Sequence, residues 1–229
     1  MSARVLLITG ASSGIGAATA EAAVAAGWRV ALAARRTAQV EQLAADLGGP
    51  EHALPVTCDV TDYAQQEAAV TATVAHFGQL DAVLANAGRG GVAGGYSAGD
   101  PDAWHDMVMT NVLGVMYTIR AAVAELKKTN GHLLLTGSAS GRATMPGSVY
   151  SATKWAVTAM GHNVREELKA DGVRTTLIEP GMVDTPFFDA PKPGVLEARD
   201  VADAVVWALT QPARVDVNEI LLRPRAGLS

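Results

Sequence analysis

The stretch TGASSGIG, residues 9–16, decides how the rest of the chain is interpreted. It follows an apolar run, RVLLIT at residues 4–9, and precedes an alanine-rich stretch with the composition of a helix. A helix that begins at a glycine-rich turn presents unpaired N–H groups and the positive end of its dipole, which suits a pyrophosphate. The glycine spacing is not GxGxxG, so a turn that merely needs glycine remains the alternative.

If this turn binds a dinucleotide, each glycine has an expected part. Gly10 makes the tight turn, Gly14 lets the backbone approach the phosphates, and Gly16 lets the helix pack closely on the strand. The other cofactor contacts expected from the turn are Ser12, Ser13 and Ile15.

Composition limits the class of protein. The chain has 229 residues, 49% of them hydrophobic, which is enough for one sizeable core. A net charge of −5 and the lack of a Lys/Arg run argue against nucleic acid and anionic membranes as partners. Cys58 is the only cysteine, so no intramolecular disulfide can form. The sequence has no evident signal peptide and no run of about twenty apolar residues, so we expect a cytoplasmic protein.

Short apolar runs alternate with longer amphipathic stretches along the chain. Apolar strands separated by helices indicate a parallel sheet that is covered on both faces. The prediction is one α/β domain over residues 1–229, with a doubly wound parallel sheet of about seven strands. The predicted strands are RVLLIT (4–9), RVALAA (29–34), HALPVT (52–57), DAVLA (81–85), HLLLTG (132–137), RTTLIE (174–179) and EILLR (219–223).

Several helix boundaries carry recognisable signals. Gly-Gly-Pro at residues 48–50 ends one predicted helix. Asp62 and Gln65 have the spacing of a capping box for the next. Asp-Pro at residues 100–101 is typical of another helix start. The glycine-dense stretch before it, residues 86–100, is expected to be a flexible loop.

The end of the second predicted strand bears on the choice of cofactor. NAD-binding units place a carboxylate there, whereas this strand ends in Ala34, Arg35 and Arg36. Two guanidinium groups can hold a 2′-phosphate that a carboxylate would repel. At about 1.5–3 kcal/mol for each charged hydrogen bond, they would favour NADP over NAD by roughly 10²–10⁴-fold. Two solvated arginines are the alternative; the prediction is NADP(H).

Tyr150 and Lys154 stand four residues apart, on one face of a predicted helix. The same face continues with apolar or small residues, among which a lysine costs desolvation unless something requires it. A tyrosine that acts near pH 7 needs its pKa lowered by roughly three units, or about 4 kcal/mol. A cation about 4 Å away supplies roughly that much, so the pair predicts a proton donor and the lysine that tunes it.

Two further polar residues fit a reactive site. Asn111 falls on a helical stripe with Val108 and Val115, and a buried amide there requires a partner. Ser138 follows the run HLLLTG, at the end of a parallel strand where ligands bind in such sheets. Ser140 is a competing candidate, and a turn serine is the alternative for Ser138.

Taken in order, these motifs resemble the short-chain dehydrogenase/reductase superfamily over nearly the whole chain. The matching elements are TGASSGIG, CDV (58–60), NAG (86–88), Asn111, Ser138, YSATK (150–154) and PGMVDT (180–185). The resemblance implies a three-layer Rossmann-like fold and a catalytic tetrad. Ser138 would hold the substrate carbonyl, Tyr150 would move the hydroxyl proton, and Lys154 would lower the tyrosine pKa and bind the nicotinamide ribose. Asn111 would position a water that links Lys154 to solvent.

The resemblance also implies the reaction and the other cofactor contacts. NADPH would give a hydride to a carbonyl carbon while Tyr150 protonates the oxygen, as in a carbonyl reductase. Arg35 looks like the family's NADP signature. Besides the glycine turn, Tyr150 and Lys154, the implied contacts are Arg35, Arg36, Asp59, Val60, Asn86, Ala87, Gly88, Pro180, Gly181, Val183 and Thr185.

Two features depart from the family pattern. Ser138 and Tyr150 are twelve residues apart, one fewer than the family spacing, which indicates a shortened loop between them. The substrate-binding loop at about residues 186–198 is also short, which suggests an open site with relaxed specificity.

The substrate pocket is expected to be mostly apolar and to include residues 89–96, Met145, Pro146, Val149, Phe187 and Phe188. Arg89 could pair with a substrate carboxylate or be solvated. The C-terminal VDVNEILLRP, residues 215–224, resembles a branch of the family that handles small 3-hydroxy acids, aldehydes and ketones.

Two alternatives to a carbonyl reductase therefore remain: a dehydrogenase of small 3-hydroxy acids and a non-catalytic NADP(H)-binding redox sensor. The family implies a homo-oligomer, either a tetramer or a dimer. The five histidines lack ligand spacing, so no metal is expected.

Overall fold

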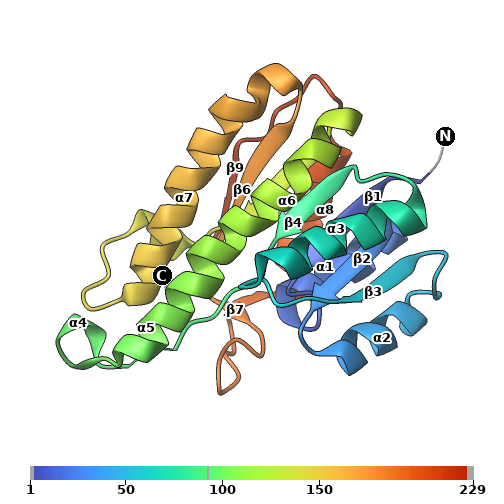
Figure 1. Ribbon diagram of the computed structural model, residues 1–229. Helices are drawn as coiled ribbons and strands as arrows, with labels where there is room; N and C mark the ends of the chain where they lie inside the picture. The colour runs from blue at the N-terminus through green and yellow to red at the C-terminus, as the bar shows by residue number, and fades with distance from the viewer. Residues whose placement is uncertain (1–2, 92, 226–229) are drawn as a thin grey trace.

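The computed structural model describes residues 3–91 and 93–225, and its centre is one parallel β-sheet (Figure 1). Seven strands pair in the order β3-β2-β1-β4-β5-β6-β9, every pair parallel. The chain starts at the middle of the sheet, runs to one edge, and then continues on the other side of β1. The predicted doubly wound sheet is thus confirmed, with strands β1 (Val5–Thr9), β2 (Arg29–Ala34), β3 (Ala53–Thr57), β4 (Ala82–Ala85), β5 (His132–Thr136), β6 (Arg174–Pro180) and β9 (Glu219–Leu222).

Helices cover both faces of this sheet, as the buried clusters show. Leu6 and Ile8 of β1 belong to the cluster that also holds residues of α1, α2 and α8. Val5 and Leu7 belong to the opposite cluster, with residues of α3, α6 and α7. Both kinds of strand position are apolar because both faces are covered. The covering helices are α1 (Gly14–Ala25), α2 (Thr37–Asp46), α3 (Tyr63–Phe77), α6 (Gly114–Thr129), α7 (Val149–Leu168) and α8 (Ala198–Thr210).

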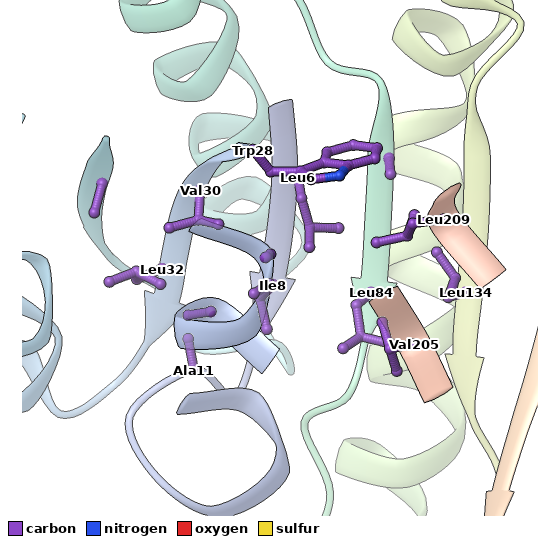
Figure 2. Close-up of a cluster of buried hydrophobic side chains, with 14 of the residues drawn as sticks. Leu6, Ile8, Ala11, Trp28, Val30, Leu32, Leu84, Leu134, Val205 and Leu209 are labelled. Atoms are coloured by element: carbon purple, nitrogen blue, oxygen red, sulfur yellow. The ribbon is translucent and has the colours of Figure 1, made fainter. Parts of the chain in front are cut away.

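Figure 2 shows the first of these clusters, where Leu6 lies beneath the ring of Trp28 and Leu84 lies close to Val205. Trp28 is 3% exposed, and the guanidinium of Arg4 stacks 4.2 Å from its ring centre. Full burial of each large apolar side chain contributes about 1.5–3 kcal/mol. The sheet is therefore a rigid platform for whatever its strand ends carry.

The predicted helix boundaries are largely confirmed. The Asp62 carboxylate accepts a hydrogen bond from the backbone N–H of Gln65, and Asp100 accepts one from Asp102 at the start of α5 (Pro101–Val108). The capping box at Asp62 is only half formed. The backbone N–H of Asp62 donates to the carbonyl of Asp59, and the Gln65 side chain instead accepts from the backbone N–H of Asp59, at 2.9 Å.

The glycine-dense stretch contains a short helix, α4 (Gly95–Ala98), and is therefore not only loop. After it, α5, the π-helical turn η1 (Met109–Leu113) and α6 run on without a break. By length and composition, residues 101–129 are the one described helical span that would suffice to cross a membrane, contrary to the sequence expectation. In this fold the α6 part packs on the sheet through buried Val115, Ala122 and Leu126.

Candidate active site

A cavity of about 510 Å³ opens at the carboxyl ends of the central strands. The chain leaves β1 toward one side of the sheet and β4 toward the other, and such a divergence is where ligands bind in open parallel sheets. Most of the predicted site residues line this cavity: Gly10, Ser12, Ser13, Gly14, Ile15, Arg35, Arg36, Asp59, Val60, Asn86, Ala87, Gly88, Ser138, Tyr150, Lys154, Pro180, Gly181 and Val183.

Three predicted residues do not line it. Gly16 packs behind the turn, and a Cβ there would lie 2.3 Å from the carbonyl oxygen of Gly10. Thr185 lies beside Gly14, at a distance of 3.2 Å from the position of an added Cβ. Asn111 is buried behind the wall, 1% exposed. All three bear on the site through neighbouring residues.

The glycine turn is tied to the end of β4. Gly10 has a φ of +68°, and a Cβ there would lie 2.8 Å from the Cα of Ala87. The Asn86 side chain donates to the carbonyl oxygens of Thr9 and Gly10, at 3.1 and 3.3 Å. In return, the Thr9 hydroxyl accepts from the backbone N–H groups of Asn86 and Ala87. The sequence analysis did not predict this role of Thr9, which links the glycine turn to the end of β4.

The entrance to α1 fits a phosphate. Its N-cap, Ser13, makes no side-chain capping bond, and its first turn holds no acidic residue, so the N–H groups there remain available. Arg36 donates to the hydroxyls of Ser12 and Ser13, the latter at 2.6 Å. The Arg35 side chain is 76% exposed, 3.9 Å from Asp59. The two guanidinium groups thus border the turn where a ribose phosphate would be recognised.

Asn111 lies in η1 and holds the loop after β4. Its Oδ1 accepts from the backbone N–H of Arg89, and its Nδ2 donates to the Arg89 carbonyl, both at 2.8 Å. Nδ2 also donates to Thr153 on α7, at 3.1 Å. The expected partner therefore exists. Val108, placed by sequence on the same buried stripe, is 40% exposed, because a π-turn takes more residues per turn than an α-helix and shifts the face.

Tyr150 and Lys154 lie one turn apart on α7, close to the end of β5. The Lys154 Nζ donates to the carbonyl oxygen of Thr136 at 2.7 Å and lies 5.7 Å from the centre of the Tyr150 ring. Thr136 was not predicted, since a backbone carbonyl leaves no signal in the sequence. The arrangement fixes the ammonium group between β5 and the phenol.

Ser138 follows β5 directly and begins the short helix η2 (Ala139–Arg142). Its Oγ accepts from the backbone N–H of Ser140 at 3.1 Å and lies 3.4 Å from the carbonyl oxygen of Pro180. Ser138 lines this cavity and also the one described below, whereas Ser140 lines only the latter. The geometry therefore favours Ser138 over Ser140.

Burial dominates the titration of Tyr150 and Lys154. It raises the pKa of Tyr150 to about 12, an effect that the Ser138 hydroxyl partly opposes. It lowers the pKa of Lys154 to about 8. The expectation that the lysine alone lowers the tyrosine pKa is therefore wrong for the free protein. Desolvation of the buried phenol dominates, while the Lys154 ammonium group donates to Thr136 and lies 5.7 Å from the centre of the ring.

A second cavity of about 440 Å³ adjoins the first, and five residues line both: Ser138, Tyr150, Gly181, Phe187 and Phe188. The ring of Phe187 lies 5.7 Å from that of Tyr150 and so close to Gly90 that a Cβ there would clash. The rest of the wall is mostly apolar or small: Gly90, Gly91, Met107, Ala139, Ser140, Ala143, Thr144, Met145, Ser148, Val149, Met182 and Arg223.

The sequence analysis predicted only part of this second wall. Among the described residues of the expected set, Arg89, residues 93–96 and Pro146 do not line it, and residue 92 lies outside the described residues. Arg89 instead forms an ion pair with Asp106 at 2.7 Å, which argues against a role in binding a carboxylate. Met182 and Arg223 were missed.

A buried ion pair lies behind Ser138. Glu179, 1% exposed, accepts two hydrogen bonds from Arg142 at 3.0 and 2.9 Å and a third from Thr158. Arg142 also reaches Glu219 on β9, at 2.6 Å. The network ties η2 to the ends of β6 and β9. A carboxylate inside the apolar run TTLIEP was the signal that could have revealed it.

Two other chemistries find little support here. Within residues 3–91 and 93–225, no three His, Cys, Asp or Glu side chains group as metal ligands. Cys58 lines the first cavity, but burial raises the pKa of its thiol to about 11, so a thiolate is not available near neutral pH.

Comparison with known proteins agrees with this geometry. The family model described as short chain dehydrogenase matches residues 4–194. An uncharacterized oxidoreductase of Staphylococcus epidermidis is 37% identical over 226 residues, which cover 96% of this chain and 97% of the relative.

Two solved structures are similar over nearly their whole length. The alcohol dehydrogenase of the archaeon Thermococcus sibiricus, complexed with 5-hydroxy-NADP, superposes with a TM-score of 0.89 at 33% identity, covering 97% of each chain. The serine dehydrogenase of Escherichia coli has a TM-score of 0.87 at 30% identity, covering 96% of this chain and 97% of its own.

Proposed function

The chain belongs to the short-chain dehydrogenase family of oxidoreductases, and we propose that it is an NADP(H)-dependent carbonyl reductase. The reaction would interconvert a ketone or aldehyde and the corresponding alcohol. One observation carries the proposal: Ser138 and Tyr150 line both cavities, one fitted to a dinucleotide and the other mostly apolar. A hydride donor and a carbonyl could therefore meet at these two residues.

The bound nicotinamide would supply the hydride. Ser138 holds the substrate oxygen by its hydroxyl, beside the phenol. Tyr150, with a pKa of about 12, is fully protonated at neutral pH and gives its proton to that oxygen as the alcohol forms. The Lys154 ammonium, held by Thr136, stabilises the resulting tyrosinate. Asn111 orients the loop at Arg89 against α7 and would position a water beside Lys154.

The choice of NADP(H) over NAD(H) rests on Arg35 and Arg36 at the end of β2. The end of β2 has no acidic residue that would repel a 2′-phosphate, and guanidinium groups match a 2′-phosphate. The 5-hydroxy-NADP bound by the Thermococcus sibiricus enzyme supports the same choice. We assign the remaining predicted contacts, from Gly10 to Thr185, to this cofactor.

Two alternative functions can be distinguished from this one by a single activity assay. The likeness to the serine dehydrogenase of Escherichia coli favours a 3-hydroxy acid as substrate. A non-catalytic sensor of NADP(H) is disfavoured because Tyr150 and Lys154 are both present. We further propose one domain over residues 1–229, with residues 186–198 as the loop over the substrate.

Assembly is part of the proposal. Trp155 on α7 and Trp207 on α8 are 48% and 53% exposed, and large exposed apolar side chains often mark contacts between proteins. They support a homo-oligomer, tetramer or dimer. We propose the cytoplasm as its location.

The test follows NADPH oxidation at 340 nm against a panel of aldehydes, ketones and 3-oxo esters, with NADH in parallel. Wild type is compared with Tyr150→Phe, which keeps the ring and loses the hydroxyl. We expect turnover that prefers NADPH and falls at least about 10³-fold in the variant, within the range for loss of general acid catalysis. Turnover that persists in Tyr150→Phe would contradict the mechanism, and NADPH binding without any turnover would favour the sensor.

A further inference from the structure

The wall of the second cavity has an uneven distribution of charge. Methionine, phenylalanine, small and hydroxyl side chains make up nearly all of it. Among the described residues that line it, Arg223 is the only charged one. A single guanidinium beside an otherwise neutral pocket is a means of orienting one anionic group.

Arg223 is also unusual among the cations near the site because its side chain has no hydrogen bond or ion pair with any described residue. Arg89 pairs with Asp106, and Arg142 pairs with Glu179. Lys154 donates to the carbonyl oxygen of Thr136. Only Arg223 is therefore free to bind an anion in this cavity without breaking an existing bond.

The position of Arg223 follows from the pairing of β6 with β9. The backbone N–H of Gly181 donates to the carbonyl of Leu222 at 2.7 Å, and a Cβ on Gly181 would lie 3.5 Å from the Cα of Arg223. Gly181 follows Pro180, whose carbonyl oxygen lies 3.4 Å from the hydroxyl of Ser138. The arginine thus stands beside the wall that carries the carbonyl-binding serine.

We propose that Arg223 binds the carboxylate of the substrate, so that this oxidoreductase acts on organic acids that carry a ketone or hydroxyl group. The inference rests on the proposed function and names the substrate class for its site. A guanidinium presents two parallel N–H donors that match a carboxylate. The apolar body of the acid would lie against Met145, Met182 and Phe187.

The experiment compares each 3-hydroxy acid with its methyl ester, in a series of increasing chain length, by NADP⁺ reduction at 340 nm. The ester keeps the shape and loses the charge. The variants are Arg223→Met and Arg223→Lys. The matched control is Arg225→Met, since Arg225 is an exposed arginine two residues away that lines neither cavity.

We expect wild type to prefer the acid. In Arg223→Met, kcat/KM for the acid should fall roughly tenfold, mainly through KM, because Arg223 is exposed and its ion pair is partly screened. The ester should change less than about twofold, Arg223→Lys should retain part of the preference, and Arg225→Met should match wild type. Added salt should weaken the acid alone.

Equal losses for acid and ester in Arg223→Met would overturn the proposal, since they would indicate a structural role. A wild type that prefers the ester would overturn it as well. If wild type turns over no alcohol or carbonyl compound, the proposed function fails separately. Calorimetric binding of hexanoate then tests Arg223 alone: equal affinity in wild type and Arg223→Met overturns the proposal, and loss in the variant supports it.

Discussion

The two cavities meet at Ser138 and Tyr150, yet they are built from different parts of the fold. The cofactor cavity is formed by the ends of six strands and a glycine turn that backbone geometry holds in place. The second cavity, which we assign to the substrate, is formed mostly by residues 90–91, 139–140, 143–145, 148–149 and 187–188. The first is rich in hydrogen-bonding groups that hold the backbone. Apart from Arg223 and the residues shared with the first, the second presents mostly apolar or small side chains.

The difference teaches which half of the site is fixed and which is adjustable. Replacing Gly10 or Gly16 with any larger residue would force backbone atoms apart. Replacing Met145 would change the shape of the second cavity without moving the backbone around the first. We therefore expect cofactor binding to be intolerant of change and substrate choice to vary with the loops.

The largest expected effect breaks the charge recognition of the cofactor cavity. In the double variant Arg35→Ala/Arg36→Ala, KM for NADPH should rise about 10²-fold while KM for NADH stays nearly constant, because we assign the two guanidinium groups to the 2′-phosphate, which NADH lacks. The lower end of the range applies because the Arg35 side chain is 76% exposed.

Initial rates with both cofactors give the measurement. Arg199→Ala, on the outside of α8, is the matched control for the loss of a surface cation. A parallel rise for NADPH and NADH would mean that the arginines hold the turn through Ser12 and Ser13 rather than selecting a phosphate.

The next effect concerns the wall that both cavities share. Glu179→Gln leaves the Arg142 guanidinium beside a neutral amide, and the free energy of unfolding should fall by about 3 kcal/mol. Removing both partners, in Arg142→Met/Glu179→Leu, should cost less than Glu179→Gln alone. Urea denaturation of wild type, Arg142→Met, Glu179→Leu and the double variant measures the coupling between the two residues.

If the two costs simply add, the pair does not act as a unit and Ser138 is held by other contacts. If they couple, we also expect kcat for the carbonyl to fall more than NADPH affinity. The reason is that η2 carries Ser138 and contacts the substrate side.

Sequence patterns predicted most of the residues that line the first cavity and few of those that line the second. The strands and the glycine turn were predictable because a buried strand must be apolar and a tight turn must contain glycine, whereas Asn86 was implied by the family resemblance. The substrate wall was not, since residues 139–149 satisfy no local rule that fixes their side chains. Arg223 was missed because only the pairing of β6 with β9 brings it beside Gly181.

The same limit explains the error about the tyrosine. The spacing of Tyr150 and Lys154 predicted correctly that they share a face, but the cost of burying both groups depends on tertiary packing. Desolvation moved the pKa of Tyr150 up and that of Lys154 down, and no sequence pattern records that cost.

A substitution of Lys154 is expected to have a third, smaller effect on the free energy of unfolding, and it separates stability from function. Burial lowers the pKa of Lys154 to about 8 from the usual 10.5. At pH values below about 8 the buried amine is charged, and this charge lowers the free energy of unfolding. Lys154→Met should therefore raise the free energy of unfolding by about 2 kcal/mol at pH 7, after allowance for the lost bond to Thr136, while abolishing turnover.

The pH dependence has a definite sign. Between about pH 8 and 10.5 the unfolded chain holds more protons on this amine than the folded one, so wild-type stability rises with pH there. The advantage of Lys154→Met should accordingly shrink over that interval. Urea denaturation of both proteins at a series of pH values is the measurement, and a constant difference would contradict the assigned pKa.

The smallest effect lies in the substrate wall and tests whether that wall is adjustable. Met145 lines only the second cavity and is 43% exposed, so Met145→Ala removes part of an apolar contact worth less than about 1 kcal/mol. KM for a bulky carbonyl compound should rise about threefold, and NADPH affinity should not change. Met116→Ala, with 47% exposure on α6 and outside both cavities, should alter neither. A fall in NADPH affinity in Met145→Ala would show that the two cavities are coupled through the residues that line both, such as Tyr150 and Phe187. The contrast between a fixed half and an adjustable half would then no longer hold.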